Sequence, residues 1–145
     1  MNPEKFNLKD YMAHKPPMLL VDKVLEESEK KAKTLFAVNN ECIFLDEKGV
    51  LARTALIEIA AQSFAAADIF QKTMKGKKLS KGFLVSVRDF KFVQDARAGD
   101  EIICDIEETN DIAQLHIVEA KLSANGMRIA TGELRIFEII EAENS

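Results

Sequence analysis

Few side chains in this sequence could transfer a proton near neutral pH, and Glu58 is the first of them. It is the single charge in the apolar stretch from Ala55 to Ala67, and Gln62 follows one helical turn later, within reach of a side-chain contact. Burying an unpaired carboxylate costs free energy or raises its pKa, so Glu58 is a candidate general acid or base. The alternative is a carboxylate at a wet edge of the helix, or one paired with Lys or Arg.

The two histidines differ in context. His14 precedes the rigid corner Pro16-Pro17, where its ring could do chemistry or could hydrogen-bond the backbone to fix the corner. His116 lies inside a predicted strand, which favours a satisfied or exposed structural role. Cys42 and Cys104 have no zinc-ligand spacing and are too few for a disulfide framework, so we expect both to be reduced and packed. No phosphate loop, serine elbow or metal cluster is present, and we expect no metal and no cofactor.

A central helix must position Glu58. Richness in Ala and Leu predicts a helix from Thr54, whose hydroxyl could serve as the N-cap, to about Thr73-Met74, where Gly76 stops it. Apolar residues between Ala55 and Ala67 cover every face, which is typical of a helix surrounded by other structure. It is too short and interrupted to span a membrane.

Strands are predicted on both sides of this helix. Before it, a short helical turn at residues 7–12 precedes strands at 18–25 and 31–38, which should pair antiparallel, and residues 44–50 form a loop. After it come strands at 83–92, 101–108, 112–122 and 127 to about 140, with turns at 109–111 and at Asn125-Gly126. A bulge near Arg88-Asp89 would keep five apolar residues on the covered face: Phe83, Val85, Val87, Phe90 and Phe92. We therefore predict an α+β fold in which a long antiparallel sheet wraps around one buried helix.

Composition limits the possible functions. The 145 residues, 47% of them hydrophobic, predict a single domain spanning 1–145. A net charge of −4 with interspersed signs argues against nucleic-acid binding. The first residues lack a secretory signal or anchor, so we expect no membrane association and a cytoplasmic location. Four lysines between residues 74 and 82 form a solvated loop or a docking site for an acidic partner such as a carrier protein.

Several motifs resemble one enzyme family. The run from His14 to Asp22 (HKPPMLLVD) is similar to the opening motif of the 3-hydroxyacyl-acyl-carrier-protein dehydratases of hotdog fold. Residues 58–62 (EIAAQ) resemble their central-helix motif, and Lys91-Phe92 and Ala98-Gly99-Asp100 match further along. The likeness spans nearly the whole chain and is greatest to a divergent branch, the predicted dehydratases of aryl-polyene and related lipid clusters.

This sequence departs from the fatty-acid-cycle dehydratases at the position of their catalytic histidine. Counting back fourteen positions from Glu58 reaches Phe44, so the usual histidine is absent and Phe44 becomes a candidate for substrate binding. The resemblance implies elimination of water from a 3-hydroxyacyl thioester on an acyl carrier protein or coenzyme A. We assign Glu58 the proton at the hydroxyl and His14 the C2 proton, with Gln62 binding substrate and the first-turn amides of Thr54 and Ala55 polarising the carbonyl.

The resemblance also implies a homodimer or higher hotdog oligomer, or a heterodimer with a related subunit, because exposed sheet edges call for a partner. Two other functions stay open. A hotdog thioesterase would release free acid from the same thioester, and a non-catalytic acyl-binding subunit would explain the missing histidine.

Overall fold

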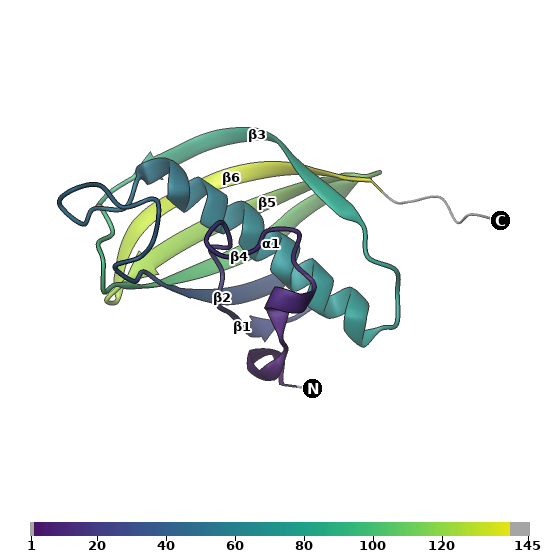
Figure 1. Cartoon of the computed structure of the whole chain (residues 1–145). Helices are drawn as coiled ribbons and strands as arrows, with labels where there is room; N and C mark the ends of the chain where they lie inside the picture. The colour runs from purple at the N-terminus through teal and green to yellow at the C-terminus, as the bar shows by residue number, and fades with distance from the viewer. Residues whose placement is uncertain (1, 140–145) are drawn as a thin grey trace.

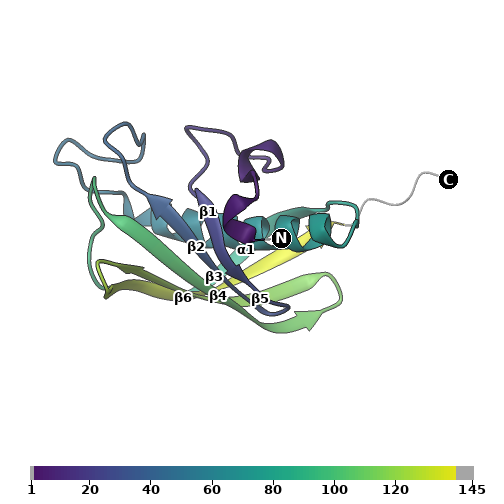
Figure 2. The ribbon, with the colours of Figure 1, turned by 90° about the horizontal axis from the view of Figure 1, so that it is seen from below.

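The computed structural model describes residues 2–139, in which a six-stranded antiparallel sheet curls around one long helix (Figures 1 and 2). The sheet order is β1-β2-β4-β5-β6-β3. The elements are short 3₁₀ turns at Pro3–Lys5 and Leu8–Asp10, then β1 (Lys23–Glu27), β2 (Lys31–Ala37), α1 (Arg53–Met74), β3 (Lys81–Phe92), β4 (Glu101–Ile112), β5 (Leu115–Ala124) and β6 (Met127–Ile139). The predicted α+β hotdog architecture is confirmed.

Helix α1 is covered on most sides, as its composition predicts. Ile59 and Ala60 are fully buried against the sheet, and Ala66 is buried on the side of the N-terminal segment. The helix stops at Gly76, whose φ of +66° allows the Gly76 amide to bond the Thr73 carbonyl and the Lys77 amide to bond the Lys72 carbonyl. Among residues 2–139, no helix combines the length and apolarity needed to cross a bilayer.

The predicted N-cap of α1 is wrong. The helix begins at Arg53, so Thr54 already lies in the first turn, and Ala52 occupies the cap position without a side-chain hydrogen bond. The Ala55 amide donates to the Ala52 carbonyl instead, at 2.9 Å. A backbone carbonyl therefore meets the first-turn donor that the Thr54 hydroxyl was expected to satisfy.

The first predicted strand begins five residues late. Residues 18–20 do not join β1 because other groups take up their backbone: the Leu20 amide donates to Gln62 Oε1 at 2.6 Å, Gln62 Nε2 donates to the Met18 carbonyl at 3.0 Å, and the Met18 and Leu19 amides donate to the Lys15 carbonyl. The Asp22 amide already donates to the Leu35 carbonyl of β2. Regular pairing with β2 starts only at Lys23, opposite Leu35. The antiparallel pairing of β1 with β2 is confirmed.

The hairpins of the C-terminal half follow the prediction in one case and not in the other. Asn125 and Gly126 have φ of 54° and 75°, as a tight two-residue hairpin requires. The turn predicted at 109–111 is wrong: a bulge between Glu108 and Asn110 absorbs those residues, and β4 continues to a turn that places Ala113 at φ 58°. The predicted end of the last strand, at about Ile140, lies outside the described residues.

Strand β3 carries the predicted bulge. Its register shifts between Arg88 and Lys91, and Asp89 has a φ of 50°. Phe90 packs against the core there, over Gly132, where a Cβ atom would lie only 2.1 Å from its ring. However, the prediction that the whole apolar row is covered is wrong, since Phe83, Val85 and Val87 are exposed. These side chains are exposed because β3 is an edge strand of the sheet.

Candidate active site

His14 and Glu58 come together in one chain. His14 lies in the segment before Pro16, Glu58 lies in the second turn of α1, and His14 Nε2 is 3.5 Å from Glu58 Oε1. Both side chains are partly exposed, 44% for His14 and 41% for Glu58. Glu58 is therefore not sealed among apolar residues as its sequence context suggested; it lies at the edge of a cavity, where it can meet a ligand.

Gln62 holds this pair in place. It is 2% exposed, and besides its two bonds to the backbone of Met18 and Leu20, its Nε2 donates to Glu58 Oε1 at 3.3 Å. One amide thus ties the segment that carries His14 to the helix that carries Glu58. A buried amide with all its partners fixes relative positions well, because leaving any partner unpaired is costly.

A cavity of about 250 Å³ opens beside the pair. One wall is a face of α1 with Ala61, Ala65 and Ile69, at the spacing of successive helical turns. The opposite wall comes from the start of β3 and the end of β6, with Leu84 and Ile136. The walls can accept an apolar chain whose reactive end lies at His14 and Glu58.

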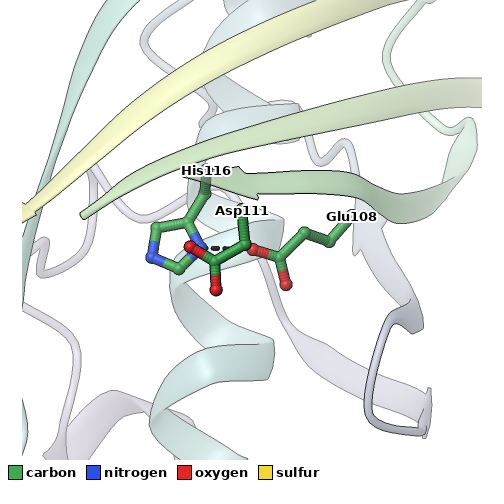
Figure 3. A group of neighbouring side chains, drawn as sticks. All are labelled: Glu108, Asp111 and His116. Carbon is green, nitrogen blue, oxygen red and sulfur yellow. Dashed lines mark hydrogen bonds and ion pairs between the residues drawn. The ribbon is translucent and has the colours of Figure 1, made fainter. Parts of the chain in front are cut away.

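The lining also includes Asp68 and Glu138, which belong to a charged cluster of five residues: Asp68, Lys72, Glu108, His116 and Glu138. Lys72 Nζ lies 2.9 Å from Asp68 Oδ2 and 2.9 Å from Glu138 Oε1. His116 Nε2 lies 3.0 Å from Glu138 Oε2, and its Nδ1 bonds Glu108 Oε1. Figure 3 shows the His116 ring turned toward Glu108, with Asp111 beside it.

The cluster controls the protonation of its members. Burial by itself would lower the pKa of His116, but the hydrogen bond and charge of Glu108 and the charges of Glu138 and Asp111 raise it above the ordinary value of 6.5. Burial would raise the pKa of Glu138, yet the hydrogen bond and charge of Lys72 lower it overall. His116 is thus satisfied by carboxylates on both ring nitrogens, in agreement with its predicted structural role.

Two members of the cluster, Glu108 and His116, and the neighbouring Asp111 are of types that bind cations. Ligand atoms of Glu108, Asp111 and His116 all lie within 4.8 Å of one another. Glu108 and the imidazole are already bonded to each other, and Lys30 Nζ lies 3.7 Å from Glu108 Oε2. Since His116 and Lys30 already pair with these carboxylates, we assign the group a structural role.

The remaining predicted site residues lie elsewhere. Thr54 is exposed in the first turn of α1, and Phe44 packs against the core and lines a different depression next to Arg53. Neither lines the cavity beside His14 and Glu58, so their roles in binding stay predictions. The charged cluster was missed in the sequence; the i,i+4 pair Asp68 and Lys72 was its one local signal.

The family match and the most similar curated relatives indicate the same kind of enzyme, a dehydratase. Residues 6–145 match the family described as ApeP-like: ApeP dehydratase. The 3-hydroxyacyl-[acyl-carrier-protein] dehydratase FabZ of Streptococcus sanguinis is 30% identical over 132 residues, covering 88% of this chain and 92% of the relative. FabZ of Streptococcus gordonii is 30% identical over 131 residues, with 88% and 91% coverage.

Solved structures share the fold. The dehydratase heterocomplex ApeI:P from Xenorhabdus doucetiae superposes with a TM-score of 0.84 at 20% identity, covering 92% of this chain and 91% of that one. A hypothetical thioesterase with coenzyme A from Streptococcus pneumoniae gives a TM-score of 0.66 at 10% identity, covering 83% and 90%. At these identities the likeness concerns the fold alone.

Proposed function

Because this chain belongs to the ApeP-like dehydratase family, we propose that it eliminates water from a 3-hydroxyacyl thioester carried on an acyl carrier protein. One observation supports this most: His14 and Glu58, 44 positions apart in sequence, lie 3.5 Å apart at a largely apolar cavity. Elimination needs a base for the C2 proton and an acid for the departing hydroxyl, and these two side chains supply one of each.

In the proposed reaction, His14 Nε2 takes the proton from C2 while the Glu58 carboxyl group gives a proton to the C3 hydroxyl. The C2–H electron pair forms the C2–C3 double bond, the C3–O bond breaks, and water leaves. His14 then carries the extra proton and Glu58 is ionised. Because His14 Nε2 and Glu58 Oε1 are 3.5 Å apart, a proton can return from the imidazole to the carboxylate directly or through one water, which restores the starting state.

Gln62 acts in this proposal as a positioning residue. Its amide donates to Glu58 Oε1 and fixes the backbone at Met18 and Leu20, four to six residues after His14. The two proton-transferring groups in this proposal are therefore His14 and Glu58, and neither depends on Phe44, the residue at the position of the loop histidine.

A carrier protein is the proposed bearer of the substrate, with coenzyme A as the alternative. Ser80 and Gly82 line the cavity, and the connection just before them carries Lys75, Lys77 and Lys78 in exposed positions. Positive charge beside the cavity would attract an acidic carrier and guide the thioester inward.

We propose that a second hotdog chain, identical or related, pairs with β3. This edge strand has twelve residues and exposes Phe83, Leu84 and Val85, which are 52%, 39% and 61% exposed. A long apolar edge is a template for another strand. Because Phe83 and Leu84 also line the cavity, such a partner would lie next to the bound acyl group.

The proposed activity is tested by product analysis. The purified chain should convert a 3-hydroxyoctanoyl thioester of carrier protein into the 2-enoyl thioester, followed by ultraviolet absorbance and mass spectrometry. Accumulation of free acid would mean a thioesterase instead. Absence of any product, both alone and with a related hotdog subunit, would leave the chain as a non-catalytic acyl-binding protein.

A further inference from the structure

The buried polar side chains of this fold gather at one place. Among the residues that the structure describes, they are Thr34, Gln62 and Ser63, which are 1%, 2% and 0% exposed. Gln62 and Ser63 are neighbours in α1, in the turn that follows Glu58, and Thr34 comes from β2 to meet Ser63. The buried polar contacts therefore converge on the part of the helix that carries the candidate acid.

Thr34 and Ser63 form a directed chain of hydrogen bonds. The Ser63 hydroxyl donates to the Ile59 carbonyl at 2.6 Å, and the Thr34 and Ser63 hydroxyl oxygens are 2.7 Å apart. A hydroxyl has only one proton to donate, so Thr34 must be the donor to Ser63. The chain links β2 to the main chain of α1 at the residue after Glu58.

Apolar packing alone does not fix the rotation of α1 about its axis. Apolar residues cover every face of the helix between Ala55 and Ala67, and burial of apolar surface has no direction. Several rotations would therefore bury similar areas. Hydrogen bonds in two directions remove this freedom, because Gln62 bonds the N-terminal segment, Ser63 meets Thr34, and successive helical residues point about 100° apart.

The rotation of α1 matters for the proposed reaction. A side-chain carboxylate lies about 6 Å from the helix axis, so a rotation of about 20° moves it by about 2 Å. A displacement of about 1 Å at a reacting group can lower a rate about 10²-fold. We propose that Thr34 and Ser63 are positioning residues for dehydration, because they hold α1 at the rotation that brings Glu58 to His14; this inference rests on the proposed function.

Substitutions can separate positioning from stabilisation. Replacing both partners of a buried hydrogen bond by apolar groups of similar shape is nearly neutral for stability, whereas removing one partner leaves the other unsatisfied. Thr34→Val/Ser63→Ala should therefore have a Tm within about 3 °C of wild type, and Ser63→Ala alone should lose about 3–9 °C. Both proteins should lose at least about tenfold in kcat, with KM within about threefold of wild type.

A conservative substitution should behave in the opposite way. Thr34→Ser keeps the hydroxyl and removes one methyl group from a buried site, so its Tm should fall by about 2–5 °C while kcat stays within about twofold of wild type. Ile102→Val is the matched control, because it removes one carbon from a residue of β4 that is 0% exposed and has no hydroxyl; it should show the same pattern.

Crystal structures provide a readout that does not depend on turnover. In Thr34→Val/Ser63→Ala, the separation of His14 Nε2 and Glu58 Oε1 should increase by at least about 1 Å from 3.5 Å, with α1 rotated as a unit. If wild-type protein gives no enoyl product, the proposed function fails, and this separation alone decides the inference.

Two results would overturn the inference: a folded Thr34→Val/Ser63→Ala protein with kcat within about twofold of wild type, or an unchanged separation of His14 and Glu58 in its crystal structure. If that protein does not fold, Thr34→Val takes its place, because it removes the same hydrogen bond and leaves the bond from Ser63 to Ile59 intact. A Thr34→Ser protein that loses as much activity as Thr34→Val would also refute the role of the hydroxyl.

Discussion

Replacing Gln62 by Leu should cost both stability and the geometry of the site. The substitution keeps the side chain's size but removes every hydrogen bond of a residue that is 2% exposed. The Leu20 amide, bonded at 2.6 Å in a buried position, loses this partner, and an unsatisfied buried group costs about 1–3 kcal/mol. The Met18 carbonyl and Glu58 lose bonds in partly exposed positions, worth about 0.5–1.5 kcal/mol each.

The free energy of unfolding should therefore fall by about 2–4 kcal/mol, since water can satisfy part of what is lost. For a chain of this size, that corresponds to a decrease in Tm of about 6–12 °C. Denaturant titration gives the free energy, and a thermal scan followed by circular dichroism gives Tm. Gln71→Leu is the matched control: Gln71 lies on the same helix, half-buried, and its side chain makes no hydrogen bond among the described residues, so a change within about 0.5 kcal/mol is expected.

A Gln62→Leu protein with wild-type Tm would refute this reasoning, because the His14 segment would then be held by other contacts. Gln62→Glu separates the two kinds of bond: its carboxylate can still accept from the Leu20 amide but cannot donate to the Met18 carbonyl or Glu58. Because that carboxylate would be buried and would face the Met18 carbonyl and the Glu58 carboxylate, the stability of Gln62→Glu at neutral pH should be no higher than that of Gln62→Leu.

The other predictions concern activity, pH and assembly. Glu58→Gln should remain folded and lose turnover. His14→Asn should keep its Tm, while its rate falls about 10²-fold and the lower-pH limb of its activity profile disappears. Normal turnover by a less stable His14→Asn protein would show instead that the role of His14 is structural. Folding raises the pKa of His116, so the contribution of His116 to stability is complete below pH 6.5 and is lost as pH rises through the raised pKa. The difference in stability between wild type and His116→Gln should therefore shrink above neutrality. A stability difference that does not change with pH would contradict this. Light scattering should find an oligomer at micromolar concentration, and Phe83→Lys/Val85→Lys should dissociate it; a wild-type monomer would refute the β3 interface.

Sequence reasoning succeeded where the determinants are local. The Asn125-Gly126 hairpin follows from the residues' tolerance of positive φ, and the end of α1 follows from Gly76. It failed where a distant side chain overrides local preference: residues 18–22 have the composition of a strand, but Gln62, more than forty positions away, bonds their backbone. The turn at Ala113 was missed because alanine rarely adopts a positive φ.

The same difference between local and distant determinants applies to the candidate site. Glu58 and Gln62 were found together because one helical turn separates them, and His14 was found as an unusual residue before two prolines. Their meeting at 3.5 Å depends on the path of the whole N-terminal segment. The charged cluster could not be assembled from sequence, since Lys72 and Glu138 are 66 positions apart and come from a helix and an edge-adjacent strand.

The stability of the site depends on how firmly the N-terminal segment, which carries His14, is attached to the rest of the fold. This segment packs through a small cluster of Leu8, Met12, Val21, Val24 and Ala66, while its Leu20 joins the larger core under the sheet. We expect the part before Leu20 to detach as a local unit, at lower free energy than global unfolding, and to carry His14 away from Glu58 while the sheet stays intact. Native-state hydrogen exchange of the Leu20 amide would report this opening, and exchange as slow as that of the most protected β5 amides would show that the segment opens only with the whole fold.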